Sequence, residues 1–447
     1  MGTYLQRANS SPSSQKKFTV STWVKVCREG GDKYMWSMRT DDSNWIGCRF
    51  AVNGCIILQV YTSGSTTGQL QTNAFFRDFS AWYHVVVAVD TTQSTAGDRL
   101  KLYVNGSQET SFSTTTNPSL NADIPITSNF QVATSPYSSQ YSSNSLDGYL
   151  AQFIYADNQA YSPSTFGSTN TNGIWIPNSS PSVTYGNNGF KLDFAGTGTA
   201  ANASGFGADS SGNGNHFASN SLGTNPSTTD TCQNNFATLN IRDERQSATF
   251  TKGALEVVTN SSNRNYVTMT QATKGGKWYL ECKFSDGAGN GYVGFCDMNN
   301  LQMSGTSTLG DKSNEARVNS DGSYEKNNST TSGWAGSFTD NDILGLALDC
   351  DNNRFTLSKN GQWADGSGNY DEANPTAYIS FTSGNFMSFA FGEGAGGATA
   401  TIEVNAGQPI FTISSSNSDA NGEGSFEYAV PSGYYALCTN NLAAHGG

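Results

Sequence analysis

The chain has 447 residues, 13% of them charged and 12% aromatic, with a formal net charge of −12. A chain of this length exceeds one ordinary hydrophobic core and predicts two domains of roughly 200 residues each. The acidic balance, in which the longest basic run is Lys16-Lys17, argues against nucleic acid as a partner. No apolar run approaches the roughly 20 residues of a membrane helix, which argues against membrane insertion.

Alternation of apolar and polar residues with a period of two dominates the first half of the chain. Residues 82–90 are apolar on both faces and predict a central strand, whereas Leu100, Leu102 and Val104 share one face of a half-solvated strand. Strands of both kinds imply two packed sheets. The segment Ser107–Ser145 is rich in Ser, Thr, Asn and Pro and predicts a long loop.

Three Asn-Gly pairs mark hairpins in both halves of the chain. Asn53-Gly54, Asn105-Gly106 and Asn360-Gly361 each lie between two alternating runs. Asn and Gly tolerate the positive φ of a type I′ turn, whose twist matches that of the flanking strands. Each pair therefore predicts a tight hairpin.

The second half of the chain repeats the pattern of short strands separated by turn residues. Its predicted strands lie at residues 254–258, 277–284, 291–295, 342–349, 354–358, 377–381 and 387–391. Regular short strands of this kind indicate a sandwich. We predict an all-β fold of two antiparallel β-sandwich, jelly-roll-like domains in tandem, with residues 1–240 in the first domain and residues 241–447 in the second.

Cysteine and histidine are few, and their positions favour structural roles. No two of the eight cysteines have the C-x-x-C spacing of a zinc ribbon. Cys282 and Cys350 fall in apolar strand patterns and are predicted to be buried free thiols. His84 falls in the central strand 82–90, and we interpret it as a satisfied core histidine.

Five aromatic residues stand among polar and glycine residues, where a core needs no ring: Trp45, Tyr324, Trp334, Trp363 and Tyr370. Trp and Tyr are amphipathic and enriched at binding surfaces. These rings are therefore candidates for stacking on the apolar face of a sugar. The alternative is that each ring caps an edge of a sandwich.

Two adjacent carboxylates, Asp41 and Asp42, are candidate calcium ligands in a polar turn. The segment that begins at Asp349 starts like an EF-hand loop, but it has Arg354 where the turn needs Gly and Asn360 where a bidentate Glu belongs. A hairpin turn explains that second segment better. We predict no required cofactor and keep calcium as an alternative at Asp41 and Asp42.

Ordered sequence blocks carry two family resemblances. The first half resembles the concanavalin A-like, laminin-G-like jelly rolls in FTVSTWVKV (18–26), WYHVVVAVD (82–90), RLKLYVNG (99–106) and LDGYLAQFIYADNQAYSP (146–163). The second half resembles a SPRY domain in GKWYLECKF, GYVGF, NDILGLALDCDNNRFTLSKNG and PSGYYALCTNNLA. The tandem is similar to structural proteins of tailed bacteriophages, especially fibre or surface-adhesin chains.

The resemblance implies binding of a glycan or protein through loops on a β-sandwich, without catalysis. We expect a non-enzymatic phage virion protein, a tail-fibre or capsid-surface adhesin that binds a host-surface glycan or receptor, contacts other virion proteins and forms a homo-oligomer. Residues 1–25 lack a signal-peptide layout, so we expect synthesis in the host cytoplasm and a final place on the particle surface. Two alternatives stay open. One is a structural capsid decoration or cement protein, and the other is a polysaccharide hydrolase, for which no E-x-D-x-E pattern is found.

The segment ADSSGNGNHF (208–217) fits a metal-binding loop, a linker or a tight turn. In laminin-G-like chains a DSSGNGN segment comes near the start, whereas here it follows the last jelly-roll strand. The first domain therefore resembles a circularly permuted jelly roll with its C-terminal strands in residues 189–240. Asp209 can bond its own backbone, and Gly212 and Gly214 accept positive φ, so we predict a tight turn.

Overall fold

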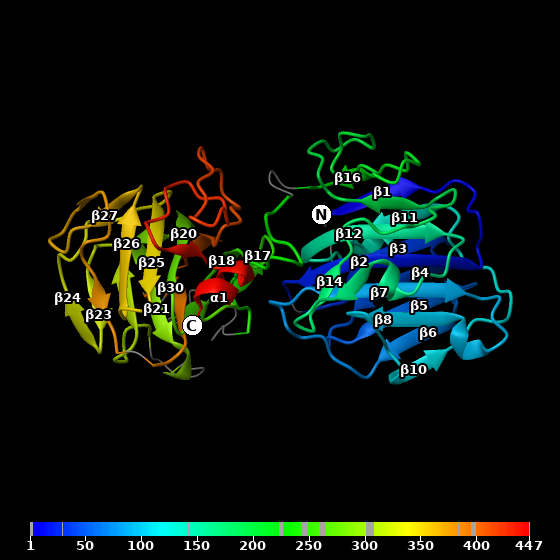
Figure 1. Cartoon of the computed structure of the whole chain (residues 1–447), viewed down its shortest axis with the longest axis horizontal. Helices are drawn as coiled ribbons and strands as arrows, with labels where there is room; N and C mark the ends of the chain where they lie inside the picture. The colour runs from blue at the N-terminus through cyan, green and yellow to red at the C-terminus, as the bar shows by residue number, and fades with distance from the viewer. Residues whose placement is uncertain are drawn as a thin grey trace. The chain divides into compact units, whose positions relative to one another are not determined.

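The protein consists of two compact all-β units. The computed structural model describes residues 3–28, 30–141, 143–222, 227–242, 248–259, 265–300, 308–382, 384–394 and 399–446. Unit 1 is Met1–Ser227 and unit 2 is Thr228–Gly447, and the colour of the chain in Figure 1 runs from blue to green in unit 1 and from green to red in unit 2. In the described part of the chain, the one α-helix is α1 (Thr439–His445), and no helix is long and apolar enough to cross a membrane. The predicted fold class, all-β with antiparallel sandwiches, is confirmed.

Unit 1 is a sandwich of two antiparallel sheets with a short hairpin outside it. The eight-stranded sheet has the order β10 (Phe112–Thr116), β6 (Ser65–Thr72), β5 (Ile56–Thr62), β4 (Asn44–Phe50), β3 (Lys33–Asp41), β11 (Asn129–Val132), β1 (Tyr4–Ala8), β16 (Ala218–Asn220). The six-stranded sheet has the order β15 (Phe190–Leu192), β12 (Gly148–Asp157), β2 (Lys17–Val26), β7 (Tyr83–Asp90), β8 (Leu100–Val104), β9 (Ser107–Gln108). The hairpin pairs β13 (Gly167–Thr169) with β14 (Trp175–Pro177), and the short 3-10 helices are η1 (Ala96–Asp98), η2 (Ser138–Gln140) and η3 (Pro163–Thr165).

The central strand β7 is buried on both faces, as predicted from its sequence. Its residue His84 is fully buried on the outer face of the six-stranded sheet, where its Nδ1 accepts a hydrogen bond from Trp175 Nε1 at 3.0 Å. The Nε2 atom lies 2.9 Å from Ser21 Oγ, and the ring stacks on Trp23. Burial lowers the pKa of His84 to about 3. His84 is therefore a satisfied, neutral core histidine, as predicted.

The segment Ser107–Ser145 is not the single long loop that its composition predicts. It contains β9, β10 and β11, and β11 lies within the eight-stranded sheet between β3 and β1. Phe130 and Val132 of β11 are buried in the core of unit 1. A four-residue strand offers only two inward positions, which is too short a pattern for alternation to reveal.

Residues 190–220, which follow the jelly-roll-like sequence blocks, complete both sheets of unit 1. β15 pairs with β12 of the six-stranded sheet, and β16 pairs with β1 of the eight-stranded sheet. Phe190, Leu192 and Phe217 are fully buried in the core. The sandwich therefore closes only when residues 190–220 are in place.

The DSSGNGN segment between these strands is a tight turn. The Asp209 carboxylate accepts the backbone N–H groups of Lys191, Ser211 and Asn215 at 3.0, 2.8 and 2.8 Å. Gly212 has a φ of +95°, the left-handed region that favours glycine. The three accepted N–H groups satisfy this carboxylate, so the turn needs no ion to hold it together.

The division between the units lies ahead of the predicted boundary after residue 240. Phe236, Ala237 and Leu239 are buried in the clusters of unit 2. The Ala237 N–H donates to the carbonyl of Leu437 at 3.0 Å, and the Leu239 N–H donates to that of Ala254 at 2.8 Å. These contacts assign the segment NNFATLN to the second unit.

Unit 2 is a second sandwich. Its larger sheet has the order β17 (Thr249–Thr251), β18 (Glu256–Val258), β31 (Thr401–Asn405), β20 (Lys277–Asp286), β25 (Ile343–Asp349), β26 (Arg354–Lys359), β27 (Gln362–Ala364), β28 (Tyr370–Glu372), with β29 (Ile379–Ser380) beside β26 and β32 (Tyr435–Ala436) parallel to β20. The six-stranded sheet has the order β19 (Asn265–Thr268), β30 (Met387–Glu393), β21 (Gly291–Asp297), β22 (Ala316–Asn319), β23 (Tyr324–Lys326), β24 (Ser329–Thr331). Two 3-10 helices, η4 (Ala288–Asn290) and η5 (Met298–Asn300), flank β21.

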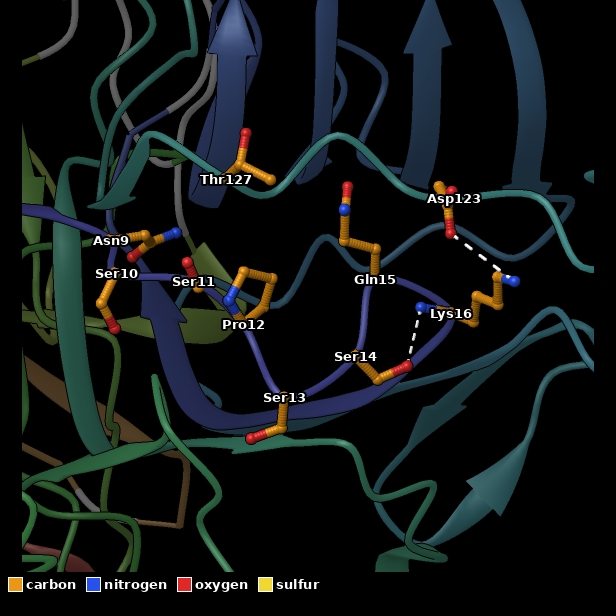
Figure 2. Close-up of a pocket in the computed structure, with 10 residues that line it drawn as sticks. All are labelled: Asn9, Ser10, Ser11, Pro12, Ser13, Ser14, Gln15, Lys16, Asp123 and Thr127. Carbon is orange, nitrogen blue, oxygen red and sulfur yellow. Dashed lines mark hydrogen bonds and ion pairs between the residues drawn. The ribbon is translucent and has the colours of Figure 1, made fainter.

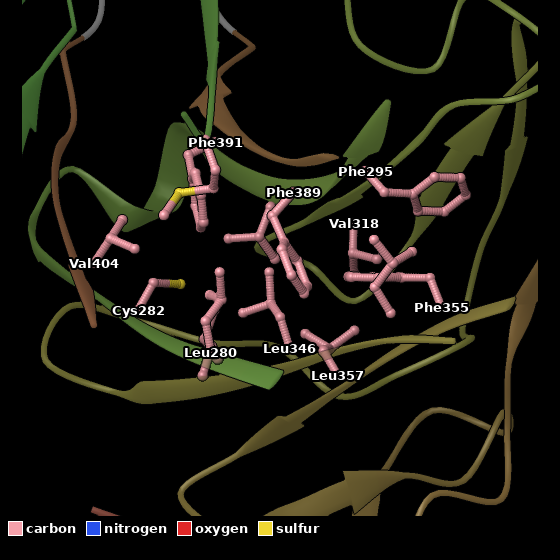
Figure 3. Close-up of a cluster of buried hydrophobic side chains, with 14 of the residues drawn as sticks. Leu280, Cys282, Phe295, Val318, Leu346, Phe355, Leu357, Phe389, Phe391 and Val404 are labelled. Atoms are coloured by element: carbon pink, nitrogen blue, oxygen red, sulfur yellow. The ribbon is translucent and has the colours of Figure 1, made fainter. Parts of the chain in front are cut away.

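The core of unit 2 lies between these two sheets (Figure 3). Leu280 and Cys282 of β20 face Phe389 and Phe391 of β30, and all four side chains are essentially inaccessible to water. Cys350 is also buried, so the prediction of buried free thiols at Cys282 and Cys350 is confirmed. Alternation along β20 therefore sets the inward face, as the sequence pattern predicts.

Two of the three Asn-Gly pairs form the predicted turn. Asn105-Gly106 and Asn360-Gly361 have φ values of +48°, +82°, +49° and +83° and join β8 to β9 and β26 to β27. Asn53-Gly54 instead lies in the longer connection 51–55 between β4 and β5. There the Gly54 N–H donates to the Ala51 carbonyl at 2.8 Å. The hairpin is confirmed, but its turn is wider than the type I′ turn that we predicted.

A buried carboxylate fastens the C-terminal segment (residues 417–438) to the outer face of β20. Glu281 is fully buried, and its carboxylate accepts the backbone N–H groups of Glu427 and Tyr428 at 2.9 and 2.8 Å. Asn405 Nδ2 and the Tyr279 hydroxyl also donate to it, both at 3.2 Å. Burial raises the pKa of Glu281 to about 7, and the four donors oppose this rise.

We predict that a fragment ending at Gly167 is far less stable than one ending at Ser227. The shorter fragment lacks β15 and β16, and each lost burial of Phe190, Leu192 or Phe217 removes about 2 kcal/mol. The combined loss of about 6 kcal/mol is comparable to the total stability of a domain. Urea denaturation followed by circular dichroism measures the difference, and equal midpoints would contradict the role of residues 190–220.

We also predict that Glu281 makes the stability of unit 2 depend on pH. Because the pKa of this carboxyl is about 7 in the folded unit and near 4.5 in an unfolded chain, ionisation disfavours folding. The stability of unit 2 should therefore fall by about 3 kcal/mol as pH rises from 4.5 to 7 and then stay constant. Thermal unfolding across this range, compared with Glu281→Gln, isolates the effect. The variant should lack this slope, so its stability relative to the wild type should rise between pH 4.5 and 7. An unchanged slope in the variant would refute the assignment.

Candidate functional site

The three tryptophans proposed as exposed sugar-stacking rings are buried. Trp45, Trp334 and Trp363 have exposed fractions of 3%, 7% and 4%. Trp334 belongs to the core of unit 2 and packs edge-on against Tyr324, with ring centroids 5.7 Å apart. Trp363 of β27 packs with Tyr279 of β20 beneath the C-terminal segment. The prediction of exposed tryptophan rings is wrong, because segments distant in sequence cover the faces on which these rings lie.

The two predicted tyrosines are half-buried and lie in unit 2. Tyr324 of β23 contacts Trp334, and Tyr370 of β28 lies 5.2 Å from the Lys359 ammonium. Burial raises the pKa of Tyr370. Trp45 lies in unit 1, so the five predicted rings do not converge on one site within either unit.

Asp41 and Asp42 stabilise the turn between β3 and β4. Asp41 Oδ1 accepts the Ser43 N–H at 2.8 Å and the Asn44 side-chain amide at 2.9 Å. Asp42 forms an ion pair with Arg39 at 2.8 Å. Across the residues that the structure describes, no group of three or more His, Cys, Asp or Glu side chains could hold a metal ion. Local turn bonds therefore account for both carboxylates.

The eight-stranded sheet of unit 1 has a polar outer face. Because side chains alternate along a strand, the strands that bury Ile46, Cys48, Leu58 and Leu70 turn the intervening residues outward. The register then sets outward residues of neighbouring strands side by side. We define the polar face by these residues: Arg49 on β4, Gln59 and Tyr61 on β5, Thr66, Gln69 and Gln71 on β6, and Thr114 and Thr116 on β10.

A chain of hydrogen bonds orders the polar face across three strands. Arg49 Nε donates to Asp32 Oδ2 at 2.6 Å, and Arg49 Nη1 donates to Gln59 Oε1 at 3.1 Å. Gln59 Nε2 in turn donates to Thr66 Oγ1 at 2.9 Å. Each bond orients the next side chain. The donors and acceptors of the face therefore have fixed positions before a ligand binds.

Gly47, at the centre of the sheet, makes room for the Tyr34 ring. Gly47 lies between Ser37 and Gln59 in cross-strand register. A Cβ atom at this position would lie 2.9 Å from the Tyr34 ring, so the ring occupies space that a side chain would take. The Arg49 guanidinium lies over the same ring, 5.3 Å from its centroid.

Trp45 packs beneath Tyr61, the aromatic residue of the polar face. Its ring stacks on Tyr61 with centroids 5.3 Å apart. Its Nε1 donates to the Tyr137 hydroxyl at 2.8 Å. Tyr61 is only partly buried, so Trp45 is a buried support for a more accessible ring and not the contact surface itself.

The sequence carried a signal for this face that composition alone does not reveal. Gln59 lies between the buried Leu58 and Val60, and Gln69 and Gln71 flank the buried Leu70. Polar residues at these alternating positions predict a solvated sheet face. Which strands lie side by side is a long-range property, so the sequence pattern did not bring the glutamines together.

The first part of the chain, which forms the two antiparallel sheets and the polar face, also matches a protein family. Residues 2–155 match the concanavalin A-like lectin/glucanases superfamily. The concanavalin A-like match runs from β1 into β12 and includes every strand of the polar face. β15 and β16 of unit 1 lie beyond the matched residues. No curated protein matches the sequence.

Three solved structures are similar to part of this chain. The chain is similar to the SPRY domain of human HERC1, with 12% identity, coverage of 37% of this chain and 96% of that chain, and a TM-score of 0.30. The native heptameric SAP-like pentraxin from Limulus polyphemus has 16% identity, coverage of 41% and 89%, and a TM-score of 0.30. The TRIM65 PSpry domain has 13% identity, coverage of 38% and 88%, and a TM-score of 0.29.

We predict that Trp45→Ala lowers the free energy of unfolding of unit 1 by about 3 to 5 kcal/mol, because it removes a buried ring and leaves a cavity. Phe75→Ala, at a ring that is 53% exposed, is the matched control and should cost less than about 1 kcal/mol. Urea denaturation of each full-length variant measures the two losses. Equal, small losses would contradict the buried position of Trp45.

Proposed function

We propose that unit 1 binds a glycan through the polar face. The observation that carries this proposal is the ordered row of Arg49, Gln59 and Thr66 on a sheet face that stays partly exposed. Sugar hydroxyls both donate and accept hydrogen bonds, as do the carboxamide and hydroxyl groups of this face. Side chains already held in position lose little entropy on binding. The concanavalin A-like lectin/glucanase fold of unit 1 is compatible with carbohydrate binding.

Tyr61 supplies the apolar part of the proposed contact. An aromatic ring offers a flat, amphipathic surface that packs on the C–H face of a sugar ring. The stack on Trp45 and the bond from Trp45 to Tyr137 hold the Tyr61 ring in place. Polar residues beside one ring give the site both orientation and packing contacts.

We propose that the polar face binds its glycan without cleaving it. Glycoside hydrolysis generally needs two carboxyl groups flanking the scissile bond, about 5 to 10 Å apart. No residue that defines the face is a carboxylate, and Asp32 at its margin is bound to Arg49 at 2.6 Å. The Asp32 carboxylate therefore serves to orient the Arg49 guanidinium.

We further propose that this protein acts on the surface of a tailed-phage particle as an adhesin for host glycans. The support is the tandem sequence resemblance described above together with the low content of charged residues, 13%. Many copies on one particle, as a homo-oligomer among other virion proteins, would let weak individual sites act together. The proposal requires mass spectrometry to find the chain in purified particles, and a cement role predicts the chain there without glycan binding.

We predict that Gln59→Ala and Gln69→Ala each weaken glycan binding by about tenfold, the effect of losing one or two hydrogen bonds. A glycan array identifies the ligand, and titration calorimetry of the full chain then measures the dissociation constants. Gln108→Ala, at an exposed position of β9, is the matched control and should bind normally. Normal binding by both polar-face variants would place the ligand elsewhere, and release of reducing ends would contradict the non-enzymatic role.

A further inference from the structure

A polar cavity of about 620 Å³ opens between two connections of unit 1 (Figure 2). One wall is the loop 9–16 that joins β1 to β2, and the other is the segment 123–127 before β11. The walls are bonded at both ends. The Asn9 N–H donates to the Ser128 carbonyl at 2.7 Å, and the Ile124 N–H donates to the Gln15 carbonyl at 2.9 Å. Near the first end, Asn9 Nδ2 also donates to the Ile126 carbonyl at 2.7 Å. Between this end and the Ile124 bond the walls separate and leave the cavity.

Buried polar side chains fix the conformation of the loop 9–16. The Asp157 carboxylate, which is fully buried, accepts the backbone N–H groups of Ser13 at 2.7 Å and Ser14 at 3.2 Å. Asn188, also buried, accepts the Ser10 N–H at 2.9 Å and donates to the Ser10 carbonyl at 2.8 Å. Asp157 and Asn188 therefore fix the backbone of the loop, and the cavity is preformed.

The lining is neutral and rich in hydrogen-bonding groups. Five of the ten lining residues carry hydroxyl groups and two carry carboxamides. Lys16 and Asp123 carry opposite charges that cancel, with Nζ and Oδ1 3.9 Å apart at one end of the cavity. Gln15 extends from the loop toward the opposite wall in Figure 2. An exposed hydroxyl, that of Ser11, adds a group that both donates and accepts.

We propose that this cavity is a second binding site of unit 1, separate from the polar face, and that it takes one neutral sugar unit. Its volume falls within the roughly 300 to 1,000 Å³ of small-molecule sites. An apolar ligand would cover the Ser11 hydroxyl and the Gln15 carboxamide without pairing them, which is costly. An anion would meet Asp123 as well as Lys16 and gain no net charge attraction. A neutral polyhydroxylated molecule satisfies groups of both kinds.

The test is saturation-transfer NMR on the full chain with D-glucose, D-galactose, N-acetyl-D-glucosamine and D-glucuronate as probes. At least one neutral sugar should bind, and D-glucuronate should bind more weakly. Gln15→Ala should weaken binding of the neutral sugar about tenfold. Ser11→Trp should abolish it by filling the cavity. Ser94→Trp, at an exposed position elsewhere in unit 1, is the control for the added ring and should bind normally.

The polar-face variant Gln59→Ala separates this site from the proposed glycan face. Monosaccharide binding that survives Gln59→Ala and is lost in Ser11→Trp supports the cavity. Binding that is lost in Gln59→Ala and survives Ser11→Trp overturns the cavity proposal and leaves the polar face as the sugar site. Absence of binding by all three neutral sugars, or a preference for D-glucuronate, also overturns the cavity proposal. Circular dichroism confirms that each variant is folded.

Discussion

Each strand of this protein has two faces, and only one of them can enter the core of its sandwich. What happens to the other face decides where a ligand can bind. In unit 1, Phe166 and Trp175 cover the outer face of the six-stranded sheet around His84. In unit 2, the C-terminal segment covers part of the larger sheet over Tyr279 and Trp363. The eight-stranded sheet instead presents Arg, Gln and Thr side chains and keeps them partly exposed.

Buried polar side chains anchor the loops through hydrogen bonds to the loop backbone. Asp157, Asn188 and Asp209 are each at least nine-tenths buried, and each accepts or donates several backbone hydrogen bonds. Glu281 does the same for the C-terminal segment of unit 2. Loops rich in Ser, Asn and Gly have few apolar side chains to anchor them, so satisfied carboxylates and carboxamides fix their shape. The polar cavity exists because its loop is held in this way.

Alternation predicted the long strands well, and it failed where the information was not local. β8 and β20 show in their sequences which face is apolar, and the core lies on that face. β7 is apolar on both faces and is buried on both. β11 is too short, and only its position between β3 and β1 shows that it is a strand of the sheet. Trp45, Trp334 and Trp363 have polar neighbours in sequence, but their neighbours in space are Tyr61, Tyr324 and Tyr279. Burial depends on those spatial neighbours.

The amino-acid sequence by itself determined the all-β class, the buried histidine of β7, the tight turn at Asp209 and the inward faces of the longer strands. These features follow from side-chain alternation and from turn chemistry, which act over a few residues. Only the tertiary structure decided that residues 190–220 close unit 1, that the tryptophans are covered and that Arg49, Gln59 and Gln69 share one face. Those outcomes depend on strand order and register, because residues far apart along the chain become neighbours only when the sheets assemble.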